Sequence, residues 1–320
     1  MSSFLIWLEW PEKCFRPCEG DMDFFRSLVS KGSRVMRVKS ERAFLKALPS
    51  ATHAIVWHFR KEWYRRAPKL RVLATPAAGR ELVAWREAPK GVKVHFGAFH
   101  GSIISETVLG FLLAWTRGFF WKGPLWPRSK LAEHCGDLQG TTAVIAGFGK
   151  IGRAIAGRLE SFGVECIGLT RHGVFTLADY HDGCAKGDVR REKAIRPILA
   201  KADWFILALP SDTGTDDFLD EKLVKLLPKK CVVVNIGRGN AVDERALLAA
   251  IEDGRLAGAY LDVFKNEPTA LNPKIGPRGK GLAAARRVPW NLIRMPHACA
   301  FSTRYMKECF SELSEEGLLR

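Results

Sequence analysis

The chain has 320 residues, of which 47% are hydrophobic and 26% charged, which is the balance of a globular protein large enough for two domains. No stretch reads as a signal peptide or a membrane span, and the apolar segment 103–121 contains Glu106 and Arg117, so it predicts a buried core helix. The net charge of +16 favours anionic ligands, but the basic residues are dispersed and accompany no nucleic-acid-binding motif, so neither a nucleic acid nor a membrane is the expected partner.

Strand-like apolar runs alternate with helix-like segments along the N-terminal part of the chain. This alternation predicts a parallel α/β sheet. The expected strands lie at residues 4–8, 35–38, 54–59, 71–74 and 93–96. The buried helix 103–121 follows them, and the Pro- and Gly-containing stretch 123–127 then reads as a connector with little regular structure.

A second alternating series begins at residue 142 and predicts a second parallel sheet. Helical stretches such as 244–252 separate its strands. These strands are expected at 143–146, 165–169, 204–209, 231–236 and 259–263. The segment 266–289 is rich in Pro, Gly and basic residues and is too long for an ordinary connection, so it predicts an exposed loop. The role of its basic part, 273–287, is left open.

The eight cysteines are scattered along the chain. The pair Cys14 and Cys18 is close, but its spacing is not that of a Cys-x-x-Cys motif, and no Cys/His cluster has the spacing of zinc ligands. We therefore expect no metal, and thiols kept reduced in a cytoplasmic location.

A glycine motif stands at the start of the second series. Residues 142–152 read TAVIAGFGKIG, an apolar run that leads into Gly-x-Gly-x-x-Gly and then into the helix-like segment 153–162. In such a strand–turn–helix, Gly147 makes the tight turn, Gly149 lets a diphosphate approach, and Gly152 lets the helix pack closely on the strand. The pattern predicts a dinucleotide site; the alternative is a glycine-rich turn that only packs a helix on a sheet.

Three polar groups follow later strands. Arg238 lies between two glycines, Glu267 precedes a proline, and His297 follows one. Taken singly, they read as a solvated charge, a turn residue and an ordinary loop histidine. Because ligands bind at the carboxyl ends of parallel strands, together they predict a carboxylate-binding arginine, a proton-transferring histidine and the carboxylate that orients it.

These motifs, in this order, resemble the D-isomer-specific 2-hydroxyacid dehydrogenase family. The resemblance is fainter in the N-terminal third, where 70–79 and 104–106 carry it. The matching residues are 138–140, 147–152, 202–203, 209–210, 235–239, 242–243, 246–247, 258–259, 261–264, 267–268 and 296–297.

The family implies two Rossmann-like or flavodoxin-like parallel-sheet domains, with the nucleotide domain inserted into the substrate domain. The NAD(P)-binding domain would comprise residues 102–299, and the substrate domain residues 1–101 and 300–320. Family members are commonly dimers held through the nucleotide domain, so a homodimer is expected. The short C-terminal return, 303–320, departs from the family pattern.

The resemblance also implies residue roles. Arg238 would bind the substrate carboxylate and polarise the carbonyl, while backbone N–H groups at Ala78 and Gly79 would help to hold the same carboxylate. His297 would be the acid in reduction and the base in oxidation, and Glu267 would orient its ring and raise its pKa. Arg80, next to this loop, is read either as a charge on the substrate side or as a solvated side chain.

The implied cofactor-binding set combines the glycine loop with the ends of the later strands. It comprises Gly147, Phe148, Gly149, Lys150, Ile151, Gly152, Thr170, Arg171, His172, Leu209, Pro210, Thr215, Ile236, Gly237, Arg238, Asp262 and His297. Where the family usually has an acidic residue for the ribose hydroxyls, this chain has Thr170 followed by Arg171. Because arginine pairs with a 2′-phosphate that a carboxylate would repel, NADP(H) is expected over NAD(H).

The expected activity is therefore reduction of a small 2-oxo acid, of the glyoxylate or hydroxypyruvate type, to the D-2-hydroxy acid, with the proton supplied by His297. The alternative is a nucleotide-sensing, corepressor-like interaction protein with little turnover, because such proteins resemble these dehydrogenases and keep the same three residues. Turnover with 2-oxo acids distinguishes the two.

Overall fold

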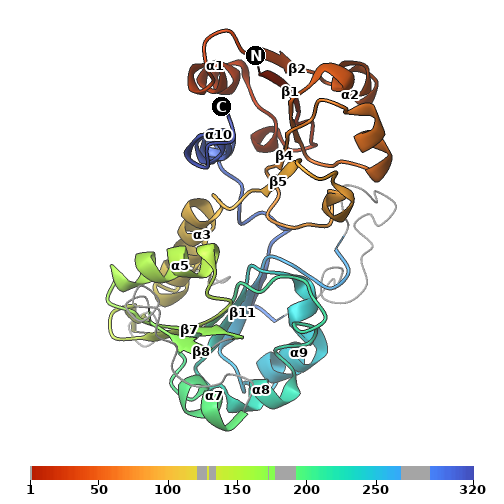
Figure 1. Cartoon of the computed structure of the whole chain (residues 1–320). Helices are drawn as coiled ribbons and strands as arrows, with labels where there is room; N and C mark the ends of the chain where they lie inside the picture. The colour runs from red at the N-terminus through yellow and green to blue at the C-terminus, as the bar shows by residue number, and fades with distance from the viewer. Residues whose placement is uncertain (1, 121–127, 130–134, 172, 177–191, 268–288) are drawn as a thin grey trace. The chain divides into compact units, whose positions relative to one another are not determined.

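The computed structural model describes residues 2–120, 128–129, 135–171, 173–176, 192–267 and 289–320. The chain forms two compact units. One comprises Met1–Ile103 together with Phe301–Arg320, and the other Ile104–Ala300, so the first unit is built from both ends of the chain (Figure 1). That these units are the substrate and nucleotide domains stays a prediction. No helix among the described residues is long and apolar enough to cross a membrane.

The first unit contains a five-stranded parallel sheet in the order β2-β1-β3-β4-β5. This is the flavodoxin-like strand order, which the sequence predicted as one of two related types. The strands are β1 (Ser3–Trp7), β2 (Arg34–Arg37), β3 (His53–Val56), β4 (Val72–Thr75) and β5 (Lys93–Phe96). All five expected strands are present, and β3 ends at Val56 rather than at residue 59.

The helices of the first unit pack apolar side chains around this sheet. The C-terminal segment folds back as α10, and the rings of Phe25 on α1 and Phe310 on α10 meet edge to face at 4.9 Å. Phe44 on α2 is fully buried in the core. The α-helices are α1 (Glu19–Leu28), α2 (Glu41–Ala47) and α10 (Tyr305–Glu315), and the 3₁₀ helices are η1 (Lys13–Phe15), η2 (Leu48–Ser50), η3 (Lys61–Arg66) and η4 (Trp85–Glu87).

The second unit contains a seven-stranded sheet in the order β12-β11-β10-β9-β6-β7-β8. Its strands are parallel except β8, which runs antiparallel to β7. The strands are β6 (Thr142–Ala146), β7 (Glu165–Thr170), β8 (Gly173–Phe175), β9 (Trp204–Leu207), β10 (Val232–Asn235), β11 (Gly258–Leu261) and β12 (Leu292–Arg294). The prediction of a Rossmann-like parallel sheet is confirmed, but β8 and β12 were not among the expected strands, because three residues are too few to set up a strand pattern.

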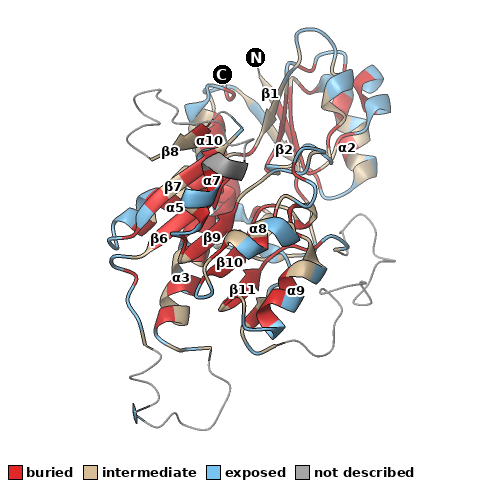
Figure 2. Cartoon of the chain, turned by 90° about the horizontal axis from the view of Figure 1, so that it is seen from below, coloured by how far each residue is buried: buried red, intermediate tan, exposed pale blue. Residues whose placement is uncertain are grey.

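Helices cover both faces of this sheet and bury its strands, which are mostly red in Figure 2. One face packs against α3 and α5, and the other against α7, α8 and α9. The helices are α3 (Gly101–Thr116), α5 (Lys150–Glu160), α7 (Glu192–Leu199), α8 (Glu221–Leu226) and α9 (Glu244–Glu252), with the 3₁₀ helix η5 (Gly239–Ala241). The helix expected at 103–121 begins earlier, at Gly101. It also ends earlier, at Thr116, because Gly118 takes a left-handed φ of 69° soon after it.

The strand register aligns the ends of five strands. Leu207 pairs with both Ala146 and Asn235, and Asn235 pairs with Leu261. Leu261 in turn pairs with Arg294. The loops that follow these strands therefore start at one edge of the sheet, the edge at which α/β proteins of this type bind ligands.

Candidate functional site

The glycine turn after β6 has the geometry that its sequence predicted. Gly147 has a φ of 93°, and a Cβ added there would lie 2.5 Å from the Ala208 carbonyl oxygen. A Cβ at Gly152 would lie 2.2 Å from the Gly147 carbonyl oxygen, so any side chain would push α5 away from the turn. A Cβ at Gly149 would meet no atom within 4 Å, which leaves open space directly before the first turn of α5.

The side chains within this turn point in different directions. Phe148 is buried, and its ring occupies the space over Gly168, where an added Cβ would lie 2.2 Å from the ring. Ile151 packs against the same core, whereas Lys150 is exposed. Phe148 and Ile151 can therefore serve a cofactor through their backbone, and Lys150 is the charged side chain of the turn.

Thr170 and Arg171, from which NADP(H) is expected over NAD(H), lie at the end of β7. The Thr170 hydroxyl donates to the Gly173 carbonyl at 3.2 Å, so it closes the turn between β7 and β8. Arg171 is exposed. His172 lies outside the described residues.

The loops after β9 and β10 pack tightly on one another. A Cβ at Gly237 would lie 2.6 Å from the Leu209 carbonyl oxygen, and Ile236 is buried. The Thr215 hydroxyl is buried and donates to the Pro210 carbonyl at 2.8 Å. Thr215 therefore shapes the loop that begins at Leu209 and Pro210.

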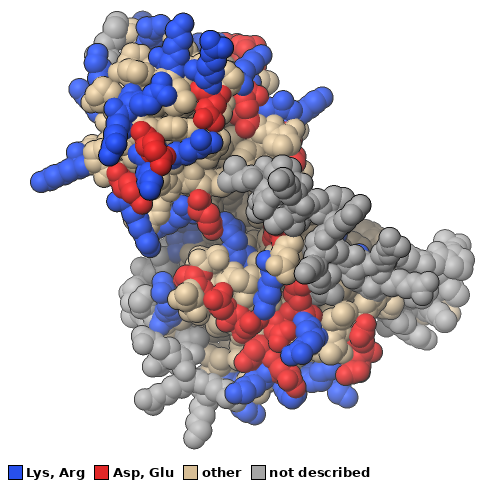
Figure 3. Space-filling model, turned by 90° about the vertical axis from the view of Figure 1, so that its right-hand side faces the viewer, with Lys and Arg blue, Asp and Glu red and all other residues tan. Residues whose placement is uncertain are grey.

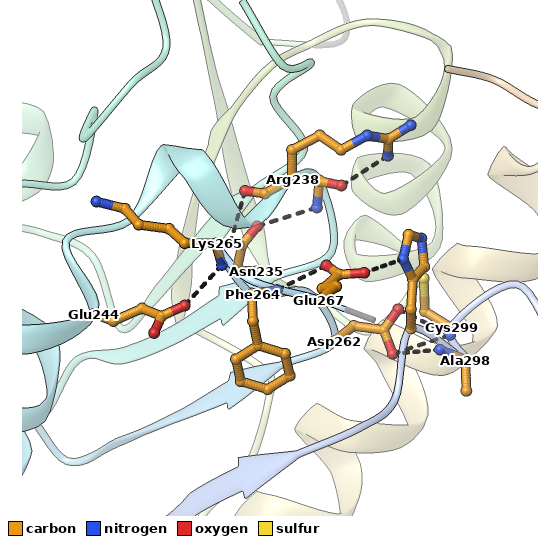
Figure 4. Close-up of polar contacts among 11 residues, drawn as sticks. Asn235, Arg238, Glu244, Asp262, Phe264, Lys265, Glu267, Ala298 and Cys299 are labelled. Atoms are coloured by element: carbon orange, nitrogen blue, oxygen red, sulfur yellow. Dashed lines mark hydrogen bonds and ion pairs between the residues drawn. The ribbon is translucent and has the colours of Figure 1, made fainter. Parts of the chain in front are cut away.

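Arg238 is held by the backbone around it. Its Nη1 donates to the Gly237 carbonyl at 2.9 Å. The fully buried Asn235 accepts from the Gly237 N–H at 3.1 Å and donates from its amide to the Arg238 carbonyl at 3.1 Å (Figure 4). Asn235 was not among the predicted site residues, although an amide at the end of an apolar strand, two residues before Gly-Arg-Gly, was a usable signal.

His297 and Glu267 form a hydrogen-bonded pair. The His297 Nδ1 lies 2.6 Å from Glu267 Oε2, and Glu267 Oε1 accepts from the Phe264 N–H at 2.8 Å (Figure 4). The His297 side chain is 51% exposed and that of Glu267 only 19%. The structure thus brings together two of the three residues predicted for catalysis.

The groups around His297 determine its pKa. Partial burial lowers its pKa, but the hydrogen bond and negative charge of Glu267, with the charge of Asp262, outweigh that effect and the opposing Arg238 guanidinium. The pKa of His297 is therefore raised above its ordinary value. The guanidinium of Arg238 is near enough to influence the same ring, so all three predicted residues belong to one electrostatic site.

Asp262 lies behind His297 rather than at the surface. It is fully buried, and its carboxylate accepts from the backbone N–H groups of Ala298, at 2.9 Å, and Cys299, at 3.0 Å. Its carbonyl oxygen accepts from the His297 N–H at 2.8 Å. His297 has a φ of 55°, in the left-handed region that a histidine seldom adopts, and these bonds hold it there.

The predicted substrate loop follows β4 in the first unit. Ala78 is exposed and Gly79 partly buried, and the Thr75 hydroxyl accepts from the Ala77 N–H at 3.2 Å. Arg80 stacks over the rings of Trp85 and Phe96, with its guanidinium carbon 5.1 and 5.4 Å from their centroids. Arg80 is thus exposed yet supported by aromatic rings.

Charge is unevenly shared between the units. The first unit has 22 Lys and Arg against 13 Asp and Glu. On the face shown in Figure 3, Lys and Arg dominate its surface, whereas acidic side chains gather on part of the second unit.

Within the described ranges, no group of three or more His, Cys, Asp or Glu could hold a metal ion.

Comparisons with known proteins agree with this geometry. Residues 111–289 match the family model described as D-isomer specific 2-hydroxyacid dehydrogenase, NAD binding domain. A glyoxylate reductase of Pyrococcus horikoshii is 32% identical over 73% of this chain and 75% of its own. A glyoxylate reductase of Thermococcus kodakarensis is 30% identical, and there the match spans 65% of this chain and 64% of the relative.

Two solved structures share the fold. The NAD-complexed form of a D-isomer specific 2-hydroxyacid dehydrogenase from Lactobacillus delbrueckii ssp. bulgaricus has a TM-score of 0.75 and 16% identity, covering 99% of this chain and 96% of that one. An acyclic imino acid reductase in complex with NADPH and D-Arg has a TM-score of 0.68 and 22% identity, covering 99% of this chain and 97% of that one. The family model and the glyoxylate reductase relatives describe enzymes, so the alternative of a nucleotide-sensing corepressor receives no support.

Proposed function

Because the chain belongs to the D-isomer specific 2-hydroxyacid dehydrogenase family, we propose that it is an NAD(P)H-dependent reductase of a small 2-oxo acid of the glyoxylate or hydroxypyruvate type. The observation that carries the proposal is the hydrogen bond between His297 and Glu267, which are 2.6 Å apart. The positive charge of Arg238 also acts on the His297 ring. Such an arrangement offers a proton donor and an anion-binding group together.

The roles of the three side chains follow from their chemistry. The Arg238 guanidinium binds the carboxylate of the 2-oxo acid and polarises its carbonyl. His297 uses Nδ1 for Glu267, so Nε2 is the nitrogen that donates a proton to the carbonyl oxygen during reduction and accepts it in the reverse direction.

The glycine turn suits a pyridine dinucleotide. The open space at Gly149, directly before the N-terminus of α5, is where the oxygens of a diphosphate would accept hydrogen bonds from backbone N–H groups. When bound, the reduced nicotinamide supplies the hydride that C2 of the substrate receives. The other residues that would hold the cofactor are Gly147, Phe148, Lys150, Ile151, Gly152, Thr170, Arg171, His172, Leu209, Pro210, Thr215, Ile236 and Gly237.

We further propose a preference for NADP(H). The support is chemical: Arg171 is exposed after β7, and the strand ends in Thr170 rather than in a carboxylate. A guanidinium pairs with a 2′-phosphate, whereas a carboxylate at this place would repel it.

We also propose that the protein is a homodimer and is located in the cytoplasm. Beyond the end of α3, Phe119 is 77% exposed, and Trp290, stacked on Trp115 at 6.3 Å, is 52% exposed. Exposed aromatic surface of this kind is typical of an interface, here with a second copy of the chain. The cytoplasmic location is supported by the seven described cysteines, all of which are free thiols.

Initial rates of NADPH and NADH oxidation against glyoxylate, hydroxypyruvate, pyruvate, phenylpyruvate and 2-oxoisocaproate test the proposal. We expect turnover with the small substrates and higher kcat/KM with NADPH. Arg171→Asp should reverse the cofactor preference, while Arg245→Asp, the same charge change at an exposed position on α9, should leave it unchanged. Cofactor binding without turnover of any 2-oxo acid would contradict the proposed activity.

A further inference from the structure

Two consecutive N–H groups beyond β11 are each bound by a glutamate carboxylate. Glu267 accepts from the Phe264 N–H at 2.8 Å, and Glu244 accepts from the Lys265 N–H at 2.8 Å (Figure 4). Glu267 belongs to the same loop, whereas Glu244 lies in the first turn of α9, 21 residues before Lys265 in the chain. Glu244 therefore ties the loop that carries Glu267 to a helix.

The N-terminus of α9 is already capped by the residue before Glu244. The Asp243 carboxylate accepts from the N–H groups of Arg245 at 3.0 Å and Ala246 at 3.1 Å. An acidic residue in a first turn usually serves the cap or the helix dipole. The bond from Lys265 gives Glu244 a role between two elements as well.

The Phe264–Lys265 peptide lies directly on the residue after Arg238. A Cβ added to Gly239 would lie 1.9 Å from the Phe264 carbonyl carbon and 2.4 Å from the Lys265 nitrogen. The Phe264 ring is buried in the core, and the Lys265 ammonium pairs with Asp217. The peptide is thus held by close packing as well as by the Glu244 carboxylate, and only glycine fits against it.

This peptide joins two parts of the candidate site. Arg238 comes directly before Gly239, and Glu267 follows the Phe264–Lys265 peptide by two residues. Both carboxylate oxygens of Glu267 are engaged, Oε1 by a backbone N–H of its own loop and Oε2 by His297 Nδ1 at 2.6 Å. A shift of the peptide would therefore move Glu267 relative to the His297 ring.

Glu267 is also the charged group of this loop that acts on His297. The other two charged groups that act on the ring, Asp262 and Arg238, are each held by backbone groups outside residues 264–267. Loss of the Glu244 bond should therefore reach His297 through Glu267.

We propose that Glu244 is a positioning residue for the pair of Glu267 and His297. It acts by holding the Phe264–Lys265 peptide against Gly239. The consequence for proton transfer rests on the proposed function. The place of Glu267 beside His297 does not require turnover, so the two can fail separately.

The test compares Glu244→Ala and Glu244→Gln with the wild type. Alanine, a strong helix former, removes the acceptor for the Lys265 N–H, whereas glutamine keeps a side-chain oxygen in its place. We expect kcat for glyoxylate reduction to fall by about 10- to 100-fold in Glu244→Ala, the cost of a small misplacement, and by less than about threefold in Glu244→Gln. NADPH affinity should stay the same in both variants, because the glycine turn is untouched.

A second readout follows the histidine itself. The midpoint of the His297 titration is measured by histidine NMR, with the signal assigned through His297→Gln. It should fall in Glu244→Ala, because a displaced Glu267 stabilises the imidazolium less, and keep the wild-type value in Glu244→Gln. In the double variant Glu244→Ala/Glu267→Gln it should equal the midpoint of Glu267→Gln alone, because Glu244 acts through Glu267.

Glu221→Ala is the matched control. Glu221 follows the capping Asp220 in the first turn of α8, as Glu244 follows its cap in α9, but its carboxylate pairs with Lys225 of the same helix at 2.6 Å. This variant removes the same first-turn charge and should leave both kcat and the His297 midpoint unchanged.

The proposal is overturned if the midpoint in Glu244→Ala matches the wild type, if Glu221→Ala lowers it equally, or if glutamine does not restore it. A double variant with a midpoint below that of Glu267→Gln would also overturn it. A midpoint lowered by Glu244→Ala in a protein whose wild type reduces no 2-oxo acid would support the positioning role and contradict only the proposed activity.

Discussion

At the scale of single residues, the site depends on how one histidine is held. The backbone of His297 is in the left-handed region, with its N–H bound to the Asp262 carbonyl and its ring bound to Glu267. A non-glycine residue in that conformation is kept there by its surroundings, which is common where geometry serves chemistry. The ring's direction is therefore a property of the loop as a whole.

Replacing His297 with glutamine should remove the proton donor and leave the glycine turn, the proposed site of the cofactor diphosphate, unchanged. We expect kcat for glyoxylate reduction to fall by about 100-fold or more, the usual contribution of a positioned acid or base. Stopped-flow rates, together with NADPH affinity from fluorescence titration, measure the two effects. Retention of activity within a few-fold would show that His297 is not the acid.

Glu267→Gln tests the cause of the raised pKa. Reduction requires protonated His297, so the rate is lost as pH rises through its pKa. Because the bond and charge of Glu267 raise that pKa, the neutral amide should lower it, and the alkaline half-point of kcat/KM should move to lower pH. A pH–rate profile measures this, and an unmoved half-point would leave Glu267 without the role proposed for it.

At the scale of elements, different glycines of the turn between β6 and α5 serve packing and ligand binding. A Cβ at Gly152 would clash with the Gly147 carbonyl, whereas one at Gly149 would meet nothing within 4 Å. The two glycines, three residues apart, therefore serve different purposes: one lets the helix approach the strand, and the other leaves room for a ligand.

Alanine substitutions should make this difference measurable. Gly152→Ala should lower Tm, because backbone rather than a flexible side chain must move, and should weaken NADPH binding with it. Gly149→Ala should weaken binding with little change in Tm. As a control, Gly110→Ala, at an exposed site within α3 and with nothing nearby, should stabilise the protein by about 0.5–1 kcal/mol. Equal loss of Tm in both turn variants would refute this division.

The sequence predicted the elements better than the directions of side chains. Apolar runs located the long strands within a few residues, although β11 ends at Leu261 because Asp262 and the next residues leave the sheet to form the loop. Nothing in the pattern showed that the carboxylate of Asp262 is buried or that the hydroxyl of Thr215 binds its own loop. Those directions depend on tertiary contacts with residues far along the chain.

At the scale of the whole molecule, a buried histidine of the first unit makes stability depend on pH. In the first unit, His53 is buried against the Phe4 ring at 4.4 Å, and its Nδ1 lies 2.8 Å from the Thr52 hydroxyl. Burial, with a smaller effect of the Arg71 charge, lowers the pKa of His53 from about 6.5 to about 4. The folded unit therefore holds this histidine neutral where the unfolded chain would protonate it.

This difference predicts a loss of stability on acidification. The unfolded state binds the proton first, so stability is complete above pH ~6.5 and falls as pH decreases toward ~4, by up to about 3 kcal/mol. His53→Phe keeps the ring against Phe4 and removes the titration. Thermal scans from pH 7.5 to 4.5 should show a shallower fall of Tm in this variant than in the wild type, and parallel curves would exclude His53 as the cause.

The return of the chain into the first unit sets an order of events during synthesis. A ribosome delivers all of residues 104–300 before the segment that forms α10. Only when that segment emerges can Phe310 meet Phe25, and only then can Glu312 accept from the Ala98 N–H and pair with His95. The second unit lies wholly between the two segments of the first, so it can complete its fold before the first unit does. A nascent chain halted at residue 300 would therefore hold a finished second unit tethered to a five-stranded sheet that still lacks α10, the form in which it would most need a chaperone.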